Sequence, residues 1–215
     1  DVNQVYRSTD GGATWGTKWD ANASGAQNFP GGASGYIEIN NNRVFIGKCA
    51  MDIGGTTWYA APTFSSSVGG SGGSSITVST NPNDGAIAID PNDPTRVYMA
   101  TDWGIGQLSC ATSMASNPWT AGQEMGNNRG IAAVILNDID FYEYSATHKE
   151  LWIATKSGVG RAVSFDPSTP SSTSTPADWY FPLYPDGSPA KQIEIHPTDP
   201  SIVFSGHGRV FRTTQ

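Results

Sequence analysis

The sequence has no apolar run that approaches the roughly 20 residues a membrane-spanning helix requires. Its two cysteines, Cys49 and Cys110, are too few for a disulfide scaffold, and they form either one bridge or two unlinked buried thiols. Charged residues make up only 14% of the chain, below the roughly 25% usual for soluble domains. The 12 basic residues are outnumbered by 19 acidic ones, so the net charge is −7. This charge disfavours binding to nucleic acid or to an anionic membrane surface.

Turn-forming residues are abundant in place of the missing charges. The chain has 25 glycines and 14 prolines, and it has no stretch of helix-forming residues at helical spacing. This composition predicts an all-β protein with many short strands joined by turns. Low charge together with many Ser, Thr and Asn residues is typical of exported proteins, so we expect an extracellular or cell-surface location.

One pattern recurs along the chain: a short apolar strand, a turn rich in Pro, Asn and Asp, a second apolar strand, and a turn into a third. The four copies are segments 36–49, 87–109, 138–164 and 193–214. Their second strands begin at Val44, Val97, Leu151 and Val203, a spacing of 52 to 54 residues. This period is typical of β-propeller blades, which stack around an axis because one blade cannot bury its own faces.

Both ends of the chain fall inside a repeat, because residues 5–8 align with residues 210–213 as a third strand. We therefore expect residues 1–215 to form one partial β-propeller domain of about four blade-length repeats, as a fragment of a larger propeller. Further polypeptide or a self-assembly partner would complete its open edges. Stretches near 65–79 and 165–177 are rich in Gly, Ser, Thr and Pro, and we expect both to be surface-loop insertions.

Residues 8–15, Ser-Thr-Asp-Gly-Gly-Ala-Thr-Trp, match the pattern S-x-D-x-G-x-T-W at every position. The pattern resembles the Asp-box of BNR-repeat β-propellers, and the chain is most similar to their xyloglucanase-type and sortilin-like members. The resemblance implies a structural hairpin made by Ser8, Asp10, Gly12, Thr14 and Trp15. The Asp carboxylate would accept hydrogen bonds within the turn, the glycines would permit positive φ, and the Trp would pack between blades. An altered second copy is present at residues 52–58.

The same resemblance suggests two kinds of enzyme. Sialidases of this group use an Arg-Ile-Pro-like motif, which is missing here, so a sialidase is disfavoured. Xyloglucanase-type hydrolases carry a catalytic Asp in the turn after a blade's second strand, and residues 98–106 are similar there. Asp102 is therefore the candidate catalytic residue, and turn capping is its structural alternative. Glycoside hydrolysis needs a second carboxylate, but Asp138 and Asp140 share a strand face where a structural role is expected.

Ligand binding would use turns on the face opposite the Asp-box. The candidates are Trp103, Trp119 and Trp179, which are expected in turns or loops, and His207. Core packing is the alternative for each tryptophan, and a solvated turn is the alternative for the histidine. No spacing indicates a metal site and no motif indicates a cofactor. The sequence thus predicts an exported or cell-surface scaffold or recognition module, with carbohydrate as a candidate ligand. The alternative is part of a xyloglucanase-type glycoside hydrolase that acts on polysaccharide.

Overall fold

The described part of the chain is all-β. A computed structural model describes residues 4–16, 19–20, 37–46, 49–55, 57–62, 64–69, 75–80, 82–101, 104–114, 116–120, 123–124, 135–145, 148–163, 178–181 and 189–214. These residues form several small sheets, as the composition predicts. Across these ranges, no helix has the length and apolarity that a bilayer span requires.

Two of the sheets are antiparallel and have four strands each. The first sheet consists of β3 (Ile37–Asn40), β4 (Arg43–Ile46), β5 (Cys49–Asp52) and β6 (Tyr59–Ala60), hydrogen-bonded in that order. The third sheet consists of β13 (Leu136–Ser145), β14 (His148–Thr155), β15 (Gly158–Val163) and β16 (Asp178–Tyr180), again in chain order. Each is a meander whose strands follow one another along the chain.

The second and fourth sheets vary this plan. The second contains β9 (Pro82–Ile89), β10 (Arg96–Thr101), β11 (Gly104–Ser109) and β12 (Gln123–Glu124), and it is extended by β7 (Phe64–Gly69) and β8 (Ser75–Thr80). The fourth contains β17 (Gln192–Ile195), β18 (Ile202–Gly206) and β19 (Val210–Thr214). A separate pair joins β1 (Gln4–Val5) to β2 (Trp19–Asp20). All these pairings are antiparallel except that of β12 with β7.

The predicted repeat coincides with this strand order. Val44, Val97, Leu151 and Val203 all lie in the second strand of their sheets, β4, β10, β14 and β18. Each of these strands pairs with the first strand on one side and with the third strand on the other. The repeat of about 53 residues is therefore a repeat of antiparallel sheets, as predicted.

The turns between first and second strands are fixed by short polar side chains. After β9, the carboxylate of Asp90 accepts the backbone N–H of Asn92 at 3.0 Å, and Asp93 accepts that of Thr95 at 3.2 Å. After β17, His196 takes the place of the first Asp, and its Nδ1 accepts the N–H of Asp199 at 3.1 Å. The bonds to Asp90 and Asp93 are the Asx-type bonds that the Pro-Asn-Asp composition predicts, and the ring nitrogen of His196 accepts in a similar way.

Consecutive sheets pack face to face. Each interface buries alternate residues of two sheets, because successive side chains of a strand point to opposite faces. Phe45 of β4 and Met99 of β10 belong to the core between the first and second sheets. Tyr98 and Leu151 belong to the next core, and Trp152 and Val203 to the core between the third and fourth sheets. The four sheets therefore form one stack in chain order.

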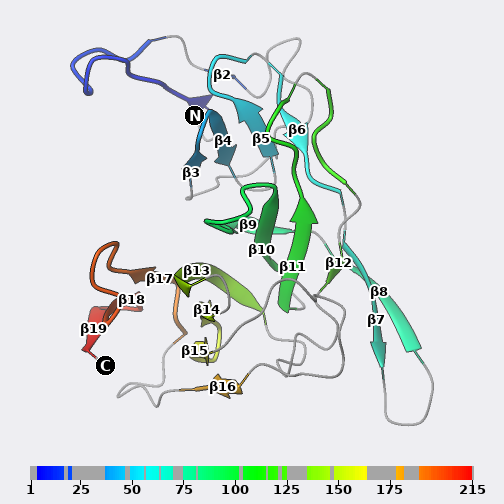
Figure 1. Ribbon diagram of the computed structural model, residues 1–215, viewed down its shortest axis with the longest axis vertical. Helices are drawn as coiled ribbons and strands as arrows, with labels where there is room; N and C mark the ends of the chain where they lie inside the picture. Colours follow the sequence, from blue (N-terminus) through cyan, green and yellow to red (C-terminus); the bar gives the residue numbers. More distant parts are fainter. Residues whose placement is uncertain are drawn as a thin grey trace.

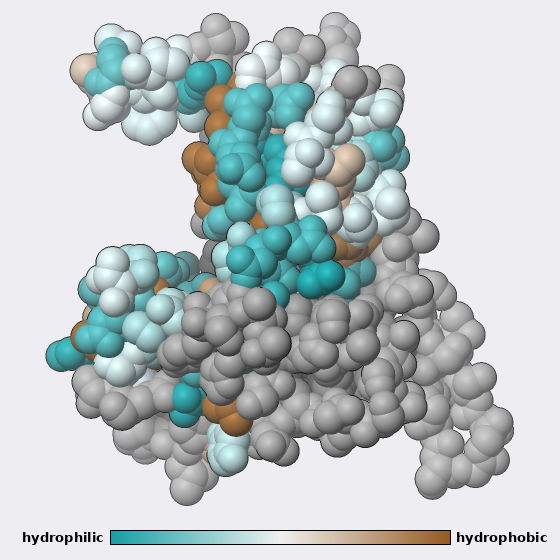
Figure 2. Space-filling model, in the orientation of Figure 1, coloured by the Kyte–Doolittle hydropathy of each residue, from teal (hydrophilic) through white to brown (hydrophobic). Residues whose placement is uncertain are grey.

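The stack of sheets curves, so that the first strand of each sheet lies on the inner side of the curve. Contacts join β3 to β9, β9 to β13 and β13 to β17, which places the four first strands next to one another (Figure 1). The first and fourth sheets are the two ends of the curve, and Figure 2 shows a hollow between them. The described sheets thus form an open arc and show no closed ring.

Segment 65–79 differs from the loop that was expected. Strands β7 and β8 form an antiparallel hairpin, in which Val68 pairs with Ile76 and Ser66 with Val78, and the hairpin extends away from the other sheets (Figure 1). Backbone pairing holds the two strands together, and the β-branched residues favour the extended conformation. The other expected insertion, 165–177, lies outside the described residues.

Candidate ligand pocket

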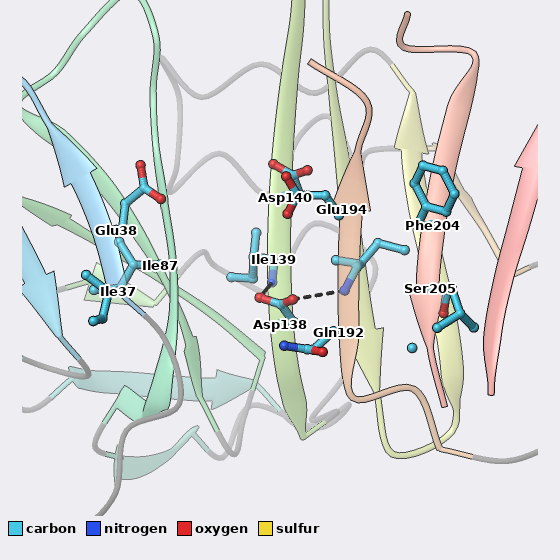
Figure 3. A pocket seen from close by; sticks show the side chains of 13 residues that line it. Ile37, Glu38, Ile87, Asp138, Ile139, Asp140, Gln192, Glu194, Phe204 and Ser205 are labelled. Atoms are coloured by element: carbon cyan, nitrogen blue, oxygen red, sulfur yellow. Dashed lines mark hydrogen bonds between the residues drawn. The ribbon is translucent and has the colours of Figure 1, made fainter. Parts of the chain in front are cut away.

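A pocket of about 380 Å³ lies where the first strands meet. Its wall combines aliphatic and aromatic side chains with four carboxylates, contributed by Glu38 of β3, Asp138 and Asp140 of β13, and Glu194 of β17. Figure 3 shows these residues around the opening, with Phe204 and Ser205 of β18 on the far side. The pocket therefore draws residues from widely separated parts of the chain.

The repeat explains why carboxylates meet here. Glu38 pairs with Phe45, Asp140 with Trp152, and Glu194 with Phe204, so each acid lies opposite an aromatic residue of the second strand. The second sheet has Ala88 at the same register, opposite Tyr98. The shared register places the three acids at one level of the inner surface.

Two of the carboxylates also hold neighbouring sheets together. Asp138 accepts the N–H of Ile193 at 2.9 Å, and Asp140 accepts that of Ile195, both on the first strand of the next sheet. They also accept N–H groups next to them in sequence, those of Ile139 and Phe141. The structural role expected for these aspartates is thereby confirmed.

Burial makes these carboxyl groups weak acids. Desolvation raises the pKa of Asp138 to about 7, although its bonds from Ile193 and Ile139 oppose the change. Desolvation also raises the pKa of Asp140 to about 6. The pKa of Glu38 is raised too, first by desolvation and then by the negative charge of Glu194. The pocket thus holds carboxyl groups that change protonation near neutral pH.

The pocket can accept hydrogen bonds from a polar ligand and can pack against its apolar surface. Carboxylates and the amide of Gln192 offer acceptors, while Ile87, Ile139 and Phe204 offer apolar contact. Within the described ranges, no group of three or more His, Cys, Asp or Glu residues is arranged to hold a metal ion. The polar groups of the pocket can therefore form hydrogen bonds, and its carboxyl groups can exchange protons.

The Asp-box-like turn at residues 8–15 has the hydrogen bonds that its motif predicts. Asp10 accepts the Ser8 hydroxyl at 2.7 Å, the Thr14 N–H at 2.9 Å and the Thr14 hydroxyl. Gly11 and Gly12 both have positive φ, 69° and 91°. The bonds from Thr14 and Ser8 lower the pKa of Asp10 to about 2. Asp10 is therefore a turn-forming residue.

The expected packing of Trp15 between sheets is wrong. Its side chain is 63% exposed, because β1 pairs only with β2 among the described strands and no sheet covers the turn. The altered copy of the motif behaves differently, since Trp58 is 1% exposed and packs with Val44, Ile46 and Met51. Arg7 connects the two copies by donating from Nη1 to the carbonyl of Ile53 at 2.8 Å.

The predicted catalytic residue cannot be compared with this pocket. Asp102 and Trp103 lie outside the described residues, between Thr101 at the end of β10 and Gly104 at the start of β11. His207 lies in the turn after β18, and its Nε2 is 2.8 Å from the hydroxyl of Ser205, which lines the pocket. Its ring also meets that of Phe211 edge-on. Of the predicted site residues that the structure describes, His207 is the one placed beside the pocket.

Trp119 lies outside the strands, as expected, but follows the alternative of core packing, whereas Trp179 lies on a strand and not in a turn or loop. Trp119 is buried between the first and second sheets, where its Nε1 donates to the carbonyl of Tyr59 at 2.8 Å and its ring meets Phe45 edge-on. A buried indole with a satisfied N–H is a core residue. Trp179 lies on strand β16, paired with Ala162. Cys110 is a free buried thiol, so it is not bridged to Cys49.

Sequence reasoning missed Glu38 and Glu194 as pocket residues. The available signal was an acid between two apolar residues at the same register of the repeat, in Ile37-Glu38-Ile39, Ile139-Asp140-Phe141 and Ile193-Glu194-Ile195. No protein-family model matches this chain, and no curated protein matches it.

Proposed function

We propose that this chain is a β-propeller recognition module that acts outside the cell or at its surface and binds carbohydrate in the pocket between its first strands. The observation that carries the proposal is the meeting of carboxylates and an aromatic ring, all from repeated positions, around one opening. Carboxylates accept hydrogen bonds from sugar hydroxyls, and the ring of Phe204 offers a face for the apolar side of a sugar.

The order and packing of the sheets support a propeller. Four sheets, in each of which the first three strands are antiparallel, follow in chain order, pack face to face and line the inner side with their first strands. Such stacking is how repeated sheets bury both of their faces. The extracellular location rests on the low charge content and on the resemblance of residues 8–15 to an Asp-box.

Calorimetric titration of the chain with xyloglucan, β-glucan and mannan oligosaccharides tests the binding. We expect Glu38→Gln to weaken binding about tenfold, because a hydrogen bond to a charged group contributes about 1.5 kcal/mol or more. The matched control is Asp199→Asn, which removes one carboxylate in an exposed turn that does not line the pocket. No binding to any of the three, or equal binding by both variants, would contradict the proposal.

A second candidate function is part of a xyloglucanase-type glycoside hydrolase. It is favoured by a carboxyl group, that of Asp138, whose pKa of about 7 suits proton donation at neutral pH. The test is release of reducing ends from xyloglucan by the chain and by Asp102→Asn. Hydrolysis that is lost in the variant favours the hydrolase. Binding without hydrolysis favours the recognition module.

A further inference from the structure

Ser205 is the one hydroxyl-bearing residue among the described residues that line the pocket. It lies on β18, where it pairs with Ile193 of β17, and it is 4% exposed. Figure 3 shows it in the pocket wall close to Phe204. The other polar side chains of this wall are the four carboxylates and the amide of Gln192. The hydroxyl has a single proton, so what it offers to a ligand depends on the direction in which that proton points.

His207 occupies one side of this hydroxyl. Its Nε2 atom lies 2.8 Å from Oγ of Ser205, which is a normal hydrogen-bond distance. The backbone N–H of His207 donates to the carbonyl of Arg209 at 2.8 Å, and its ring meets the ring of Phe211 edge-on, with 5.2 Å between the centroids. The imidazole is therefore held with one of its nitrogens next to the hydroxyl.

The direction of the hydrogen bond between Ser205 and His207 decides what the hydroxyl offers. If Nε2 has no proton, it accepts the hydroxyl proton, and the lone pairs of Oγ can accept a bond from a ligand. If Nε2 carries a proton, it donates to Oγ, and the hydroxyl proton is released toward the pocket. The two arrangements have the same distance but opposite chemistry.

The carboxylates of the pocket explain why the first arrangement is useful. Asp138 accepts the N–H of Ile193, the residue that pairs with Ser205, so this carboxylate lies next to the same pair of residues. Carboxylates are strong acceptors, and a hydroxyl proton without another acceptor would turn to them. With His207 as the acceptor, the carboxylates keep their lone pairs for a ligand.

We infer that His207 is a positioning residue, which accepts the hydroxyl proton of Ser205 and thereby keeps Ser205 an acceptor toward the pocket. Among the described lining residues, the amide of Gln192 is then the one side chain that donates when the carboxyl groups are ionised. Such a wall pairs with ligand groups that donate hydrogen bonds.

This inference rests on the proposed function and adds the kind of sugar that the pocket selects. Free hydroxyl and amino groups of a sugar can donate to the wall. The ether and ester oxygens of a methylated or acetylated sugar can only accept, so they would leave buried acceptors of the wall unpaired, and an unpaired buried group weakens binding. The pocket should therefore prefer unsubstituted sugars.

The first measurement is NMR of the imidazole nitrogens of His207 at about pH 8. A ring nitrogen with a proton and one without a proton have clearly different chemical shifts, so the spectrum shows which nitrogen is protonated. We expect Nε2 to lack a proton, and we expect its signal to move in Ser205→Ala. A proton on Nε2, or a signal that does not respond to Ser205→Ala, would overturn the inference without any ligand.

The second measurement is calorimetric titration with the xyloglucan, β-glucan and mannan oligosaccharides and with the O-methylated form of each. The pH is about 8, above the pKa values of about 7 and about 6 of Asp138 and Asp140, so that both carboxyl groups are ionised acceptors. The unchanged chain should bind a free oligosaccharide at least about tenfold more tightly than its methylated form.

Variants then connect this preference to the two residues. His207→Phe keeps a ring next to Phe211 but removes the acceptor, so it should weaken binding of the free sugar about three- to tenfold, and Ser205→Ala should do the same. The double variant should bind like Ser205→Ala alone, because His207 acts only through Ser205. Circular dichroism verifies folding, and His207→Leu replaces His207→Phe if the latter is not folded.

The matched control is His196→Asn, which removes a histidine from the turn before β18. The Asn oxygen can still accept the N–H groups that Nδ1 of His196 accepts, those of Thr198 and Asp199, and the affinity should not change. If no sugar binds in either form, the proposed function fails. If free and methylated sugars bind equally, or if the losses from His207→Phe and Ser205→Ala add in the double variant, only this inference fails.

Discussion

Lys149 and Asp90 form a buried ion pair between two sheets. The Nζ atom of Lys149 on β14 lies 3.1 Å from Oδ2 of Asp90, in the turn after β9. Both side chains are buried, and Arg96 binds the same carboxylate at 2.9 Å. The turn of the second sheet is thereby joined to the second strand of the third.

Removing the carboxylate should destabilise the chain strongly. Asp90→Ala removes the buried carboxylate that both Lys149 and Arg96 bind, so we expect a loss of about 3 to 5 kcal/mol in the free energy of unfolding. Lys149→Met should cost less, because Arg96 still pairs with Asp90. Urea denaturation measures both. The control Lys156→Met changes an exposed lysine and should remain within about 0.5 kcal/mol.

Trp15 and Trp58 provide a matched pair of tryptophans, one exposed and one buried. Trp58→Ala should destabilise by about 3 to 5 kcal/mol, because it leaves a cavity among Val44, Ile46 and Met51. Trp15→Ala removes an exposed ring and should change stability by no more than about 0.5 kcal/mol. Thermal and urea unfolding compare them directly. Equal losses would mean that Trp15 is packed in solution.

The repeat of sheets was predictable because each copy carries its own local cause. Alternating apolar residues specify strands, and Asp90, Asp93 and Asp199 with their prolines specify the turns, without reference to distant parts of the chain. The even spacing of the second strands, from Val44 to Val203, can then be counted in the sequence. The hairpin of β7 and β8 was missed because its Gly- and Ser-rich composition outweighed the alternation around Val78.

The pocket could not be predicted in the same way because it depends on packing between repeats. Glu38 and Glu194 are far apart in sequence and meet only when the sheets stack in an arc. Trp119 illustrates the opposite case, since a tryptophan outside the strands can still be covered by a neighbouring sheet. Local pattern indicates which residues share a face, but the partner of that face is set by tertiary packing.

The hairpin around Asp10 should depend on a charged carboxylate. The pKa of Asp10 is lowered to about 2 by its bonds from Thr14 and Ser8. A lowered pKa means that its contribution to stability is present above about pH 4 and is lost as the pH falls through about 2. NMR titration of the Asp10 carboxyl checks the pKa. Asp10→Asn should speed amide exchange at Thr14, and unchanged exchange would contradict this role.

Asp138 and Asp140 should give the chain the opposite pH dependence. Their pKa values are raised to about 7 and about 6, so between about pH 4 and pH 7 the folded chain binds more protons than the unfolded chain. Their contribution to stability is therefore fully present below about pH 4 and is lost as the pH rises through these values. The slope is at most about 1.4 kcal/mol per pH unit for each group.

Asp138→Asn isolates this effect, because the amide cannot ionise but its oxygen can still accept the N–H of Ile193. Urea unfolding at pH 5 and pH 8 should show the unchanged chain losing stability at the higher pH, and the variant losing less. Asp199→Asn is the control, because the pKa of this exposed carboxyl is lowered by its bonds from Ser201 and it does not ionise between those two pH values. A variant with the same pH dependence as the unchanged chain would show that Asp138 is already ionised at pH 5. In that case the N–H groups of Ile193 and Ile139 would outweigh the desolvation of its carboxylate.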